Sequence, residues 1–329
     1  MRLLAADIGG TKSNLRLFER TRGGARALRE ASLANADFPD AEALLRAFLR
    51  GTGKAPAAAC LAIAGTVSAG RAGMPNLGWT MDAAALEASL GIGRVALIND
   101  LEATACGIPG LPPGAFETLN AAVADEGPIA VIAAGTGLGE AVAVRVAGSW
   151  LALPGEGGHA DFAPGDELEL GLTRHLWARH GHASWERVVS GPGLVEIYRY
   201  LAETAGQESA RFAGEPDPAA AIAAAGLSGR DATASRALDL FARAYGAEAG
   251  NLALRCLATG GVYVAGGIAP KLIGLLRGPV FLDAFFAKGR YAGWMRRIPL
   301  RVVLEPKAAL EGAAQGALAT AGRPLPAVR

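Results

Sequence analysis

The sequence of 329 residues has few cysteines, almost no net charge and no long apolar run. Its three cysteines, Cys60, Cys106 and Cys256, are far apart and odd in number, so neither a disulfide framework nor a cysteine-rich metal site is indicated. We expect all three to pack in the core. The 32 lysines and arginines balance 31 aspartates and glutamates, and the resulting net charge of +1 provides no basic field for nucleic acid or an anionic membrane.

The absence of an uncharged apolar run of about 18 residues argues against a membrane-spanning helix. The apolar run before Asp7 is also too short for a secretory signal. We therefore expect a soluble, cytoplasmic protein that acts on a small molecule. The length predicts two domains, and 51% hydrophobic residues together with 45 glycines fit a compact, loop-rich α/β enzyme.

A polar pair follows a buried strand in the first third of the chain. Residues 95–98 are continuously apolar, which is typical of such a strand, and Asn99 and Asp100 come directly after it. Open α/β sheets bind their ligands at the carboxyl ends of these strands, so the pair is a candidate site. The alternative is that Asp100 only caps a helix over residues 101–107.

A glycine-rich turn connects the first two predicted strands. Gly9 and Gly10 leave the backbone free to approach a phosphate, and Thr11 adds a hydroxyl donor. Asp7, just before the turn, can hold Mg²⁺ through water. An ordinary hairpin turn is the alternative for this stretch.

The same pattern of strand, Gly-Thr turn and strand recurs later in the chain. Gly135, Thr136 and Gly137 lie between strands predicted over residues 129–134 and 141–146. The turn is neither a Walker loop nor a dinucleotide motif, but its backbone amides can bind an anion. The recurrence predicts a duplicated architecture with a nucleotide held between the two turns.

Three further segments carry candidate ligands. Glu156 and His159 are separated by two glycines, so both side chains can converge on one small ligand. Gly266 and Gly267 follow a predicted strand, and their turn offers a flat surface for a base and ribose. Asn76 lies in a predicted loop and can face the same crevice. A zinc site formed by the histidines is the alternative reading, but His175, His180 and His182 lack a ligand motif.

The remaining pattern predicts alternating strands and helices with a boundary at residues 108–114, which are rich in proline and glycine. Helices are predicted over residues 40–50, 82–90, 194–204, 231–257 and 308–321, with another from about residue 166, and further strands over 57–64, 261–265 and 300–304.

In order along the chain, the motifs DIGGT (7–11), ND (99–100), GTGLG (135–139), LPGEGGH (153–159), ERV (186–188) and AGG (265–267) are similar to those of the bacterial ATP-dependent glucokinase family. The resemblance implies a two-lobed, actin-like (ribonuclease H-like) hexokinase-type α/β fold with a central interlobe cleft. It also implies a small lobe of residues 1–110 and 301–329 and a large lobe of residues 111–300.

Transfer of the γ-phosphoryl group of MgATP to the 6-hydroxyl of glucose is the activity that the resemblance implies, in a homodimeric enzyme of glycolysis. Asp100 would be the catalytic base. The sugar ligands would be Asn99, Asp100, Glu156, His159 and Glu186, with Asn76 as a further candidate. The ligands of the phosphates and Mg²⁺ would be Asp7, Gly9, Gly10, Thr11, Gly135, Thr136 and Gly137, with Gly266 and Gly267 near the adenosine.

Two alternatives remain at this point. One is another hexose kinase, acting on fructose or mannose or using polyphosphate as the donor. The other is a sugar-binding regulatory protein without catalytic activity. Related sugar kinases with a structural zinc carry a cysteine-rich motif after the histidine that matches His159, and residues 160–182 contain no cysteine.

Overall fold

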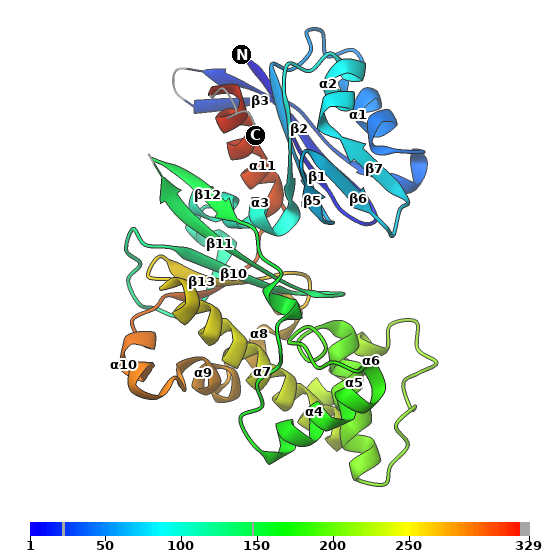
Figure 1. Cartoon of the computed structure of the whole chain (residues 1–329), viewed down its shortest axis with the longest axis vertical. Helices are drawn as coiled ribbons and strands as arrows, with labels where there is room; N and C mark the ends of the chain where they lie inside the picture. Colours follow the sequence, from blue (N-terminus) through cyan, green and yellow to red (C-terminus); the bar gives the residue numbers. More distant parts are fainter. Residues whose placement is uncertain (22–23, 147, 323–329) are drawn as a thin grey trace. The chain divides into compact units, whose positions relative to one another are not determined.

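A computed structural model of the chain describes residues 1–21, 24–146 and 148–322 (Figure 1). The chain divides into two compact units, Met1–Ala115 with Ala141–Pro154 and Glu305–Arg329, and Phe116–Glu140 with Gly155–Leu304. The predicted lobes are residues 1–110 with 301–329 and residues 111–300. They stay a prediction, because a division into compact units does not test which parts of the chain form lobes. Residues 323–329 of the predicted small lobe lie outside the described residues.

The first unit is built on a five-stranded sheet in the order β3-β2-β1-β4-β8. Its strands are β1 (Arg2–Ile8), β2 (Lys12–Thr21), β3 (Gly24–Ala34), β4 (Ala58–Ile63) and β8 (Val95–Asn99). The strands β1 to β3 are antiparallel neighbours, whereas β4 and β8 run parallel to β1. A small sheet consists of β5 (Val67–Ser68), β6 (Arg71–Met74) and β7 (Trp79–Asp82). The helices are α1 (Ala41–Leu49), α2 (Ala83–Leu90), α3 (Asp100–Gly107) and α11 (Ala308–Gly322).

The second sheet has the order β12-β11-β10-β13-β14-β9, and the boundary between the units falls within β11. Its strands are β9 (Phe116–Asn120), β10 (Ile129–Ala134), β11 (Leu138–Val146), β12 (Ser149–Leu153), β13 (Gly261–Ala265) and β14 (Leu300–Val303). The helices are α4 (Glu167–His180), α5 (Gly191–Thr204), α6 (Pro218–Leu227), α7 (Ala232–Cys256), α8 (Ile273–Leu276), α9 (Pro279–Phe286) and α10 (Ala292–Met295).

The two sheets repeat one strand order. Side by side in the second sheet lie β12-β11-β10-β13-β14, and in the first sheet β3-β2-β1-β4-β8. When the strands of each set are ranked by their order along the chain, both sets have the third, second, first, fourth and fifth strand in these places. In both, two strands parallel to β1 or β10 follow on the other side of that strand. The second sheet has β9 as an additional antiparallel strand at its edge. The predicted duplicated architecture is therefore confirmed.

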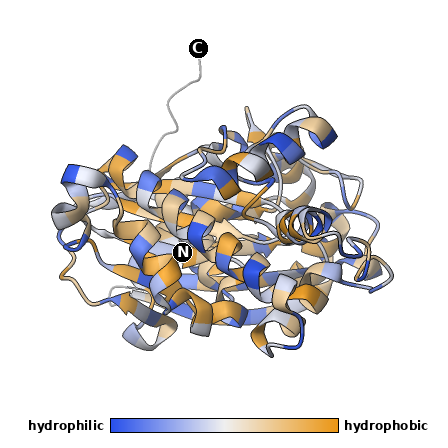
Figure 2. Ribbon diagram, turned by 90° about the horizontal axis from the view of Figure 1, so that it is seen from below, coloured by the Kyte–Doolittle hydropathy of each residue, from blue (hydrophilic) through white to orange (hydrophobic). Residues whose placement is uncertain are grey.

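Alternating side chains of β1 supply two separate core clusters of the first unit. Leu4, Ala6 and Ile8 belong to the cluster that includes residues of α1, and Leu3 and Ala5 belong to the cluster that includes residues of α11. This is expected because successive side chains of a strand point to opposite faces of its sheet. Hydrophobic and hydrophilic residues also alternate along the helices (Figure 2), as helices with one buried face require.

The helices α11 and α3 approach each other through small residues. A Cβ atom on Gly312 would lie 1.7 Å from the carbonyl oxygen of Ala103, and one on Gly107 would lie 2.2 Å from that of Ala308. Such distances are far below van der Waals contact, so only glycine permits this packing at either position. The close packing brings α11, at the end of the described chain, onto the amino-terminal sheet (Figure 1).

The predicted long helices and buried strands are confirmed, and their caps are those expected. The side chains of Asp40, Asp82, Asp166 and Asp231 each accept a hydrogen bond from the third residue on, which is the geometry of an N-cap. The predicted loop around Asn76 is confirmed for residues 75–78, but its ends belong to β6 and β7, which pair as a hairpin. The strand β3 was not predicted, because most of its residues are exposed and show no apolar alternation.

The cysteines differ in burial. Cys60 is fully buried as predicted, but Cys106 and Cys256 are only partly buried, so full core packing is wrong for these two. All three are free thiols, and burial raises the pKa of Cys60 to about 12 and that of Cys256 to about 11. Among the described residues, no helix is both long and apolar enough to cross a membrane.

Candidate active site

Two carboxylates lie at the carboxyl ends of parallel strands in the first sheet. Asp7 lies near the carboxyl end of β1, and Asp100 follows β8, with β4 between the two strands. Burial raises the pKa of Asp100 to about 6, and the negative charge of Asp7 adds to this effect. Burial also raises the pKa of Asp7, although Asn14 donates a hydrogen bond to its carboxylate at 3.1 Å. A group that loses its proton close to neutral pH suits a general base.

The side chain that caps α3 belongs to Asn99. Its Oδ1 accepts a hydrogen bond of 2.8 Å from the backbone N–H of Leu101, and its Nδ2 donates to the carbonyl of Gly65 at 3.1 Å. Asp100 is the first residue of the helix rather than its cap, so the capping alternative for Asp100 is wrong. The side chain of Asn99 also hydrogen-bonds the carboxylate of Asp100, and the sugar-binding role of Asn99 stays a prediction.

The first glycine-rich turn is an exposed hairpin tip between β1 and β2. The N–H of Gly9 donates to the carbonyl of Lys12 at 3.1 Å, and Gly10 and Thr11 are exposed. A Cβ atom on Gly10 would meet no other atom within 4 Å, so the space beside this residue is open. Asn76, in contrast, is an exposed residue of the turn between β6 and β7, and its role also stays a prediction.

Three predicted sugar ligands lie together in the second unit. His159 has Nε2 3.9 Å from a carboxylate oxygen of Glu156 and Nδ1 3.9 Å from one of Glu186. The side chains of Glu156 and His159 are 74% and 61% exposed, so they are free to bind a ligand. Glu186 is less exposed, and its second oxygen accepts a hydrogen bond of 3.0 Å from the N–H of Leu138. Glu186 thereby also holds the second glycine-rich turn.

The two residues between Glu156 and His159 must be glycines because other parts of the chain lie very close to them. A Cβ atom on Gly158 would lie 2.0 Å from the carbonyl oxygen of Leu138, and one on Gly157 would lie 2.0 Å from the carboxylate of Glu140. The carbonyl of Gly158 accepts a hydrogen bond of 2.8 Å from the N–H of Glu186. The spacing noted in the sequence therefore reflects a segment packed tightly against β11 and the residues before α5.

A cavity of about 670 Å³ in the second unit joins the second turn to the residues after β13. Gly135 and Thr136 line it together with Gly267, and the N–H of Gly191 at the start of α5 donates to the carbonyl of Gly135 at 2.8 Å. Gly266 has φ of +84°, and a Cβ atom there would lie 2.6 Å from the carbonyl of Ala134. The volume and the mainly apolar lining are typical of a small-molecule site.

The sequence prediction missed several residues of this cavity. Pro192 and Leu194 of α5, Ala219 and Ala223 of α6, and Lys271 after β13 also line it. The residues of α6 carried no usable signal, because an alanine-rich helix has no marked apolar face from which to infer a binding role. The sequence Ser-Gly-Pro-Gly at residues 190–193, at the start of α5, was not assigned to a ligand either.

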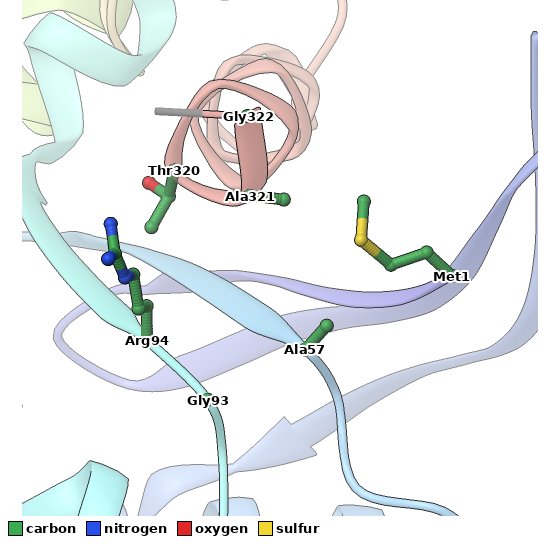
Figure 3. A pocket seen from close by; sticks show the side chains of 7 residues that line it. All are labelled: Met1, Ala57, Gly93, Arg94, Thr320, Ala321 and Gly322. Carbon is green, nitrogen blue, oxygen red and sulfur yellow. The ribbon is translucent and has the colours of Figure 1, made fainter. Parts of the chain in front are cut away.

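A second cavity, of about 480 Å³, lies in the first unit (Figure 3). Met1, Ala57 and Arg94 line it together with the end of α11. Since residues 57 and 94 directly precede β4 and β8, this cavity is at the amino ends of the parallel strands. Asp7 and Asp100 lie at the opposite ends, where ligands of such sheets bind.

Two carboxyl groups share the interior of the second unit next to Gly157. Glu140 and Glu248 are 6% and 0% exposed, and Arg255 pairs with both. Burial, followed by the charge of Glu248, raises the pKa of Glu140 to about 8. Lys288 donates instead to a backbone carbonyl and an asparagine, so one arginine compensates two carboxyls, and one of them keeps its proton at neutral pH.

We expect the free energy of unfolding to fall as the pH rises from about 4.5 towards about 8. In that interval the folded chain holds a proton on Glu140 that the unfolded chain has released, so each increase in pH favours the unfolded state. Urea titrations at several pH values measure this slope. In Glu140→Gln the free energy of unfolding should fall less over this interval, because the group that holds the proton only in the folded chain is absent. An unchanged slope would contradict the assignment.

The histidines do not form a zinc site among the residues that the structure describes, where no group of three or more His, Cys, Asp or Glu side chains is arranged to hold a metal ion. His175 lies instead 3.4 Å from Glu196 and 3.6 Å from Glu203, and His182 lies 2.8 Å from Asp161. The contacts of His175 join α4 to α5, whereas His182 and Asp161 lie outside the helices.

The fold and the sequence both match known proteins. A family model described as glucokinase matches residues 4–320. A glucokinase from Nostoc punctiforme is 41% identical over 95% of this chain and 97% of its own, and one from Synechocystis is 41% identical over 94% and 96%.

Solved structures agree with these matches. The crystal structure of a glucokinase from an Antarctic psychrotroph has a TM-score of 0.86 at 31% identity and covers 97% of this chain and 99% of its own. A glucokinase of the ROK family from Streptomyces griseus, solved with glucose and AMPPNP, has a TM-score of 0.58 at 23% identity, covers 97% and 100%, and supports the actin-like hexokinase-type fold. The chain therefore belongs to the glucokinase family, whose activity is that of an ATP-dependent hexose kinase.

Proposed function

We propose that the enzyme transfers the γ-phosphoryl group of ATP to the 6-hydroxyl of glucose, with Asp100 as the general base. The observation that carries this proposal is the buried carboxylate at the end of β8, whose pKa is raised to about 6. Phosphoryl transfer requires a group that accepts the hydroxyl proton as the oxygen meets phosphorus. At neutral pH Asp100 is mostly ionised, and its raised pKa makes it a better proton acceptor than an ordinary aspartate.

The other hydroxyls of the sugar are bound by Glu156, His159 and Glu186 in this proposal. A neutral polyol needs several convergent acceptors and donors, and the two carboxylates around His159 supply them. Asn99 and Asn76 complete the proposed set of sugar ligands. The family supports glucose as the substrate, and structures of related glucokinases were solved with glucose bound.

We assign the phosphates to the two glycine-rich turns and the nucleoside to the cavity of the second unit. Gly9, Gly10 and Thr11 offer exposed backbone amides and a hydroxyl, and Gly135, Thr136 and Gly137 form the matching turn. Gly267 lines this cavity and Gly266 directly precedes it, and we assign both to the adenosine. A mainly apolar cavity beside Gly135 favours a nucleotide over inorganic polyphosphate, because a chain of phosphates has no apolar part to bury.

Magnesium fits the acidic pair of the first unit. Burial and mutual repulsion destabilise the charges of Asp7 and Asp100, and a cation compensates such charges. We propose that Asp7 holds Mg²⁺ through water together with the phosphates of ATP. Bound Mg²⁺ would neutralise the charge on the phosphates.

Phosphorylation of several hexoses with several phosphoryl donors tests this function. Steady-state rates with glucose, fructose and mannose, each with ATP, GTP and polyphosphate, should show the highest kcat/KM for glucose with ATP. A higher value for fructose, for mannose or for polyphosphate would replace this proposal by the corresponding hexose kinase.

The cellular setting is also part of the proposal. We propose a cytoplasmic homodimer that supplies glucose 6-phosphate to glycolysis, which the family resemblance supports. Light scattering of the purified protein at micromolar concentration measures the mass of the particle, and a monomer over the whole range would contradict the homodimer.

Replacing Glu186 with glutamine should weaken glucose binding and leave the fold intact. The amide oxygen of glutamine can still accept the N–H of Leu138, but the charge that binds a sugar hydroxyl is lost. We expect the binding free energy of glucose, measured by calorimetry, to weaken by roughly 1–3 kcal/mol. Glu203→Gln, on an exposed part of α5, is the matched control and should bind normally. Unchanged affinity in Glu186→Gln would remove this residue from the sugar site.

A further inference from the structure

A buried asparagine lies beneath the first glycine-rich turn. Asn35 follows β3, and it is 1% exposed. Its Nδ2 donates to the carbonyl of Gly9 at 2.8 Å, and its backbone N–H donates to the carbonyl of Thr11 at 2.9 Å. The residue therefore holds the turn on both sides of Gly10.

The orientation of this amide follows from its partners. Ser13, which is fully buried, donates its hydroxyl to Oδ1 of Asn35 at 2.7 Å. A carbonyl such as that of Gly9 can only accept, so the NH₂ group must face it and the oxygen must face the serine. Both polar atoms of the Asn35 side chain are therefore hydrogen-bonded, one to Ser13 and one to Gly9.

The consequence for the turn comes from the planarity of the peptide unit. In a trans peptide the C=O of Gly9 and the N–H of Gly10 point in opposite directions. Holding the carbonyl of Gly9 inward on Asn35 therefore turns the amide of Gly10 away from Asn35. Gly10 itself is exposed. A glycine pair has wide conformational freedom, and without this contact the peptide plane can rotate.

We infer that Asn35 is a positioning residue that orients the backbone amides of the Gly9–Thr11 turn toward a phosphate of the nucleotide, with Ser13 fixing its side chain. The inference rests on the proposed phosphate role of this turn. Donors that are already oriented stabilise developing charge without the cost of reorganisation. Asn35 itself is buried, so the inference gives it a role through the turn and no direct contact with the nucleotide.

The test compares nucleotide binding with glucose binding in the full-length enzyme. In Asn35→Ala the KM for ATP should rise about tenfold, and in Ser13→Ala about threefold. These increases correspond to the loss of one or two neutral hydrogen bonds. Calorimetric glucose affinity should stay within about twofold of the wild type in both, since the sugar ligands do not contact Asn35. Ser13→Ala removes a single oxygen atom, so it keeps the test valid if Asn35→Ala does not fold.

The matched control is Asn120→Asp in β9. The side-chain amide of Asn120 also donates to two backbone carbonyls, at 2.6 and 3.1 Å, but it lies in the other unit. This variant should lower the Tm and leave the KM for ATP unchanged. If the Asn35 and Ser13 variants behave in the same way, the role of Asn35 is only structural and the inference is wrong.

Gly10→Val separates this inference from the proposed function. A side chain on Gly10 enters open space and should block a phosphate without a clash in the folded chain. A raised KM for ATP in Gly10→Val together with unchanged values in the Asn35 and Ser13 variants would overturn the inference alone. An unchanged KM in Gly10→Val would overturn both the phosphate role of the turn and the inference.

Discussion

Asp100→Asn should lower kcat by about 10²- to 10⁴-fold with little change in the KM for glucose. Asparagine has nearly the same size and can still donate to or accept from the 6-hydroxyl, so the ground state is retained. It cannot take the proton, and the interaction that is lost belongs to the transition state. Steady-state kinetics on the variant measure both constants.

The same substitution should raise the Tm. The pKa of Asp100 is raised from 3.8 to about 6, so its ionised form destabilises the folded state at neutral pH by roughly 1–3 kcal/mol. The difference between the variant and the wild type should disappear as the pH falls to about 4, where the unfolded chain also holds the proton. Since Asn99 already caps α3, no cap is lost.

The two readouts together decide the role of Asp100. Low turnover with a higher Tm is the result expected for a catalytic group whose burial costs stability. Low turnover with a lower Tm would indicate a structural residue. Near-normal turnover would remove Asp100 from the mechanism.

The pH profile of kcat/KM should show the ionisation of Asp100 in the free enzyme. We expect the value to be level above pH 6 and to fall about tenfold per unit below it, because only the ionised carboxylate can accept the proton. At pH 4 the rate should therefore be about 100-fold below the plateau. Rates at saturating ATP and limiting glucose, in buffers of constant ionic strength, measure the profile.

The variant Asp7→Asn tests whether the pH profile of kcat/KM depends on the interaction between Asp7 and Asp100. The charge of Asp7 is the second cause of the raised pKa of Asp100, after burial. Its removal should move the acidic limb to lower pH, whatever its effect on the maximal rate. A limb that stays at pH 6 would show that another group controls the profile.

Local patterns were sufficient to predict most of the elements. Buried strands such as β4 and β10 appear as continuous apolar runs, and helices such as α1 and α7 begin at aspartates that are visible in the sequence. These signals depend on neighbours in the chain, so no tertiary information is needed to read them. The same holds for the two glycine-rich turns.

Edge elements were missed because their signals are not local. The strands β3 and β12 are partly or largely exposed, and their pairing with β2 and β11 is what makes them strands. The helix α6 is alanine-rich, and its place at the nucleoside cavity depends on contacts with α7 and α5. Tertiary pairing makes β3 and β12 strands, and tertiary packing places α6 at the cavity.

The candidate site divides in the same way. Residue types could be read along the chain: the carboxylate of Asp100 after a strand, the pair Glu156 and His159, and the glycines of the turns. The folded structure was needed to show that Asn99 rather than Asp100 caps α3, that burial and then Asp7 raise the pKa of Asp100, and that Asn35 lies under the first turn. Burial and charge proximity depend on contacts between residues far apart in the chain, which no local pattern records.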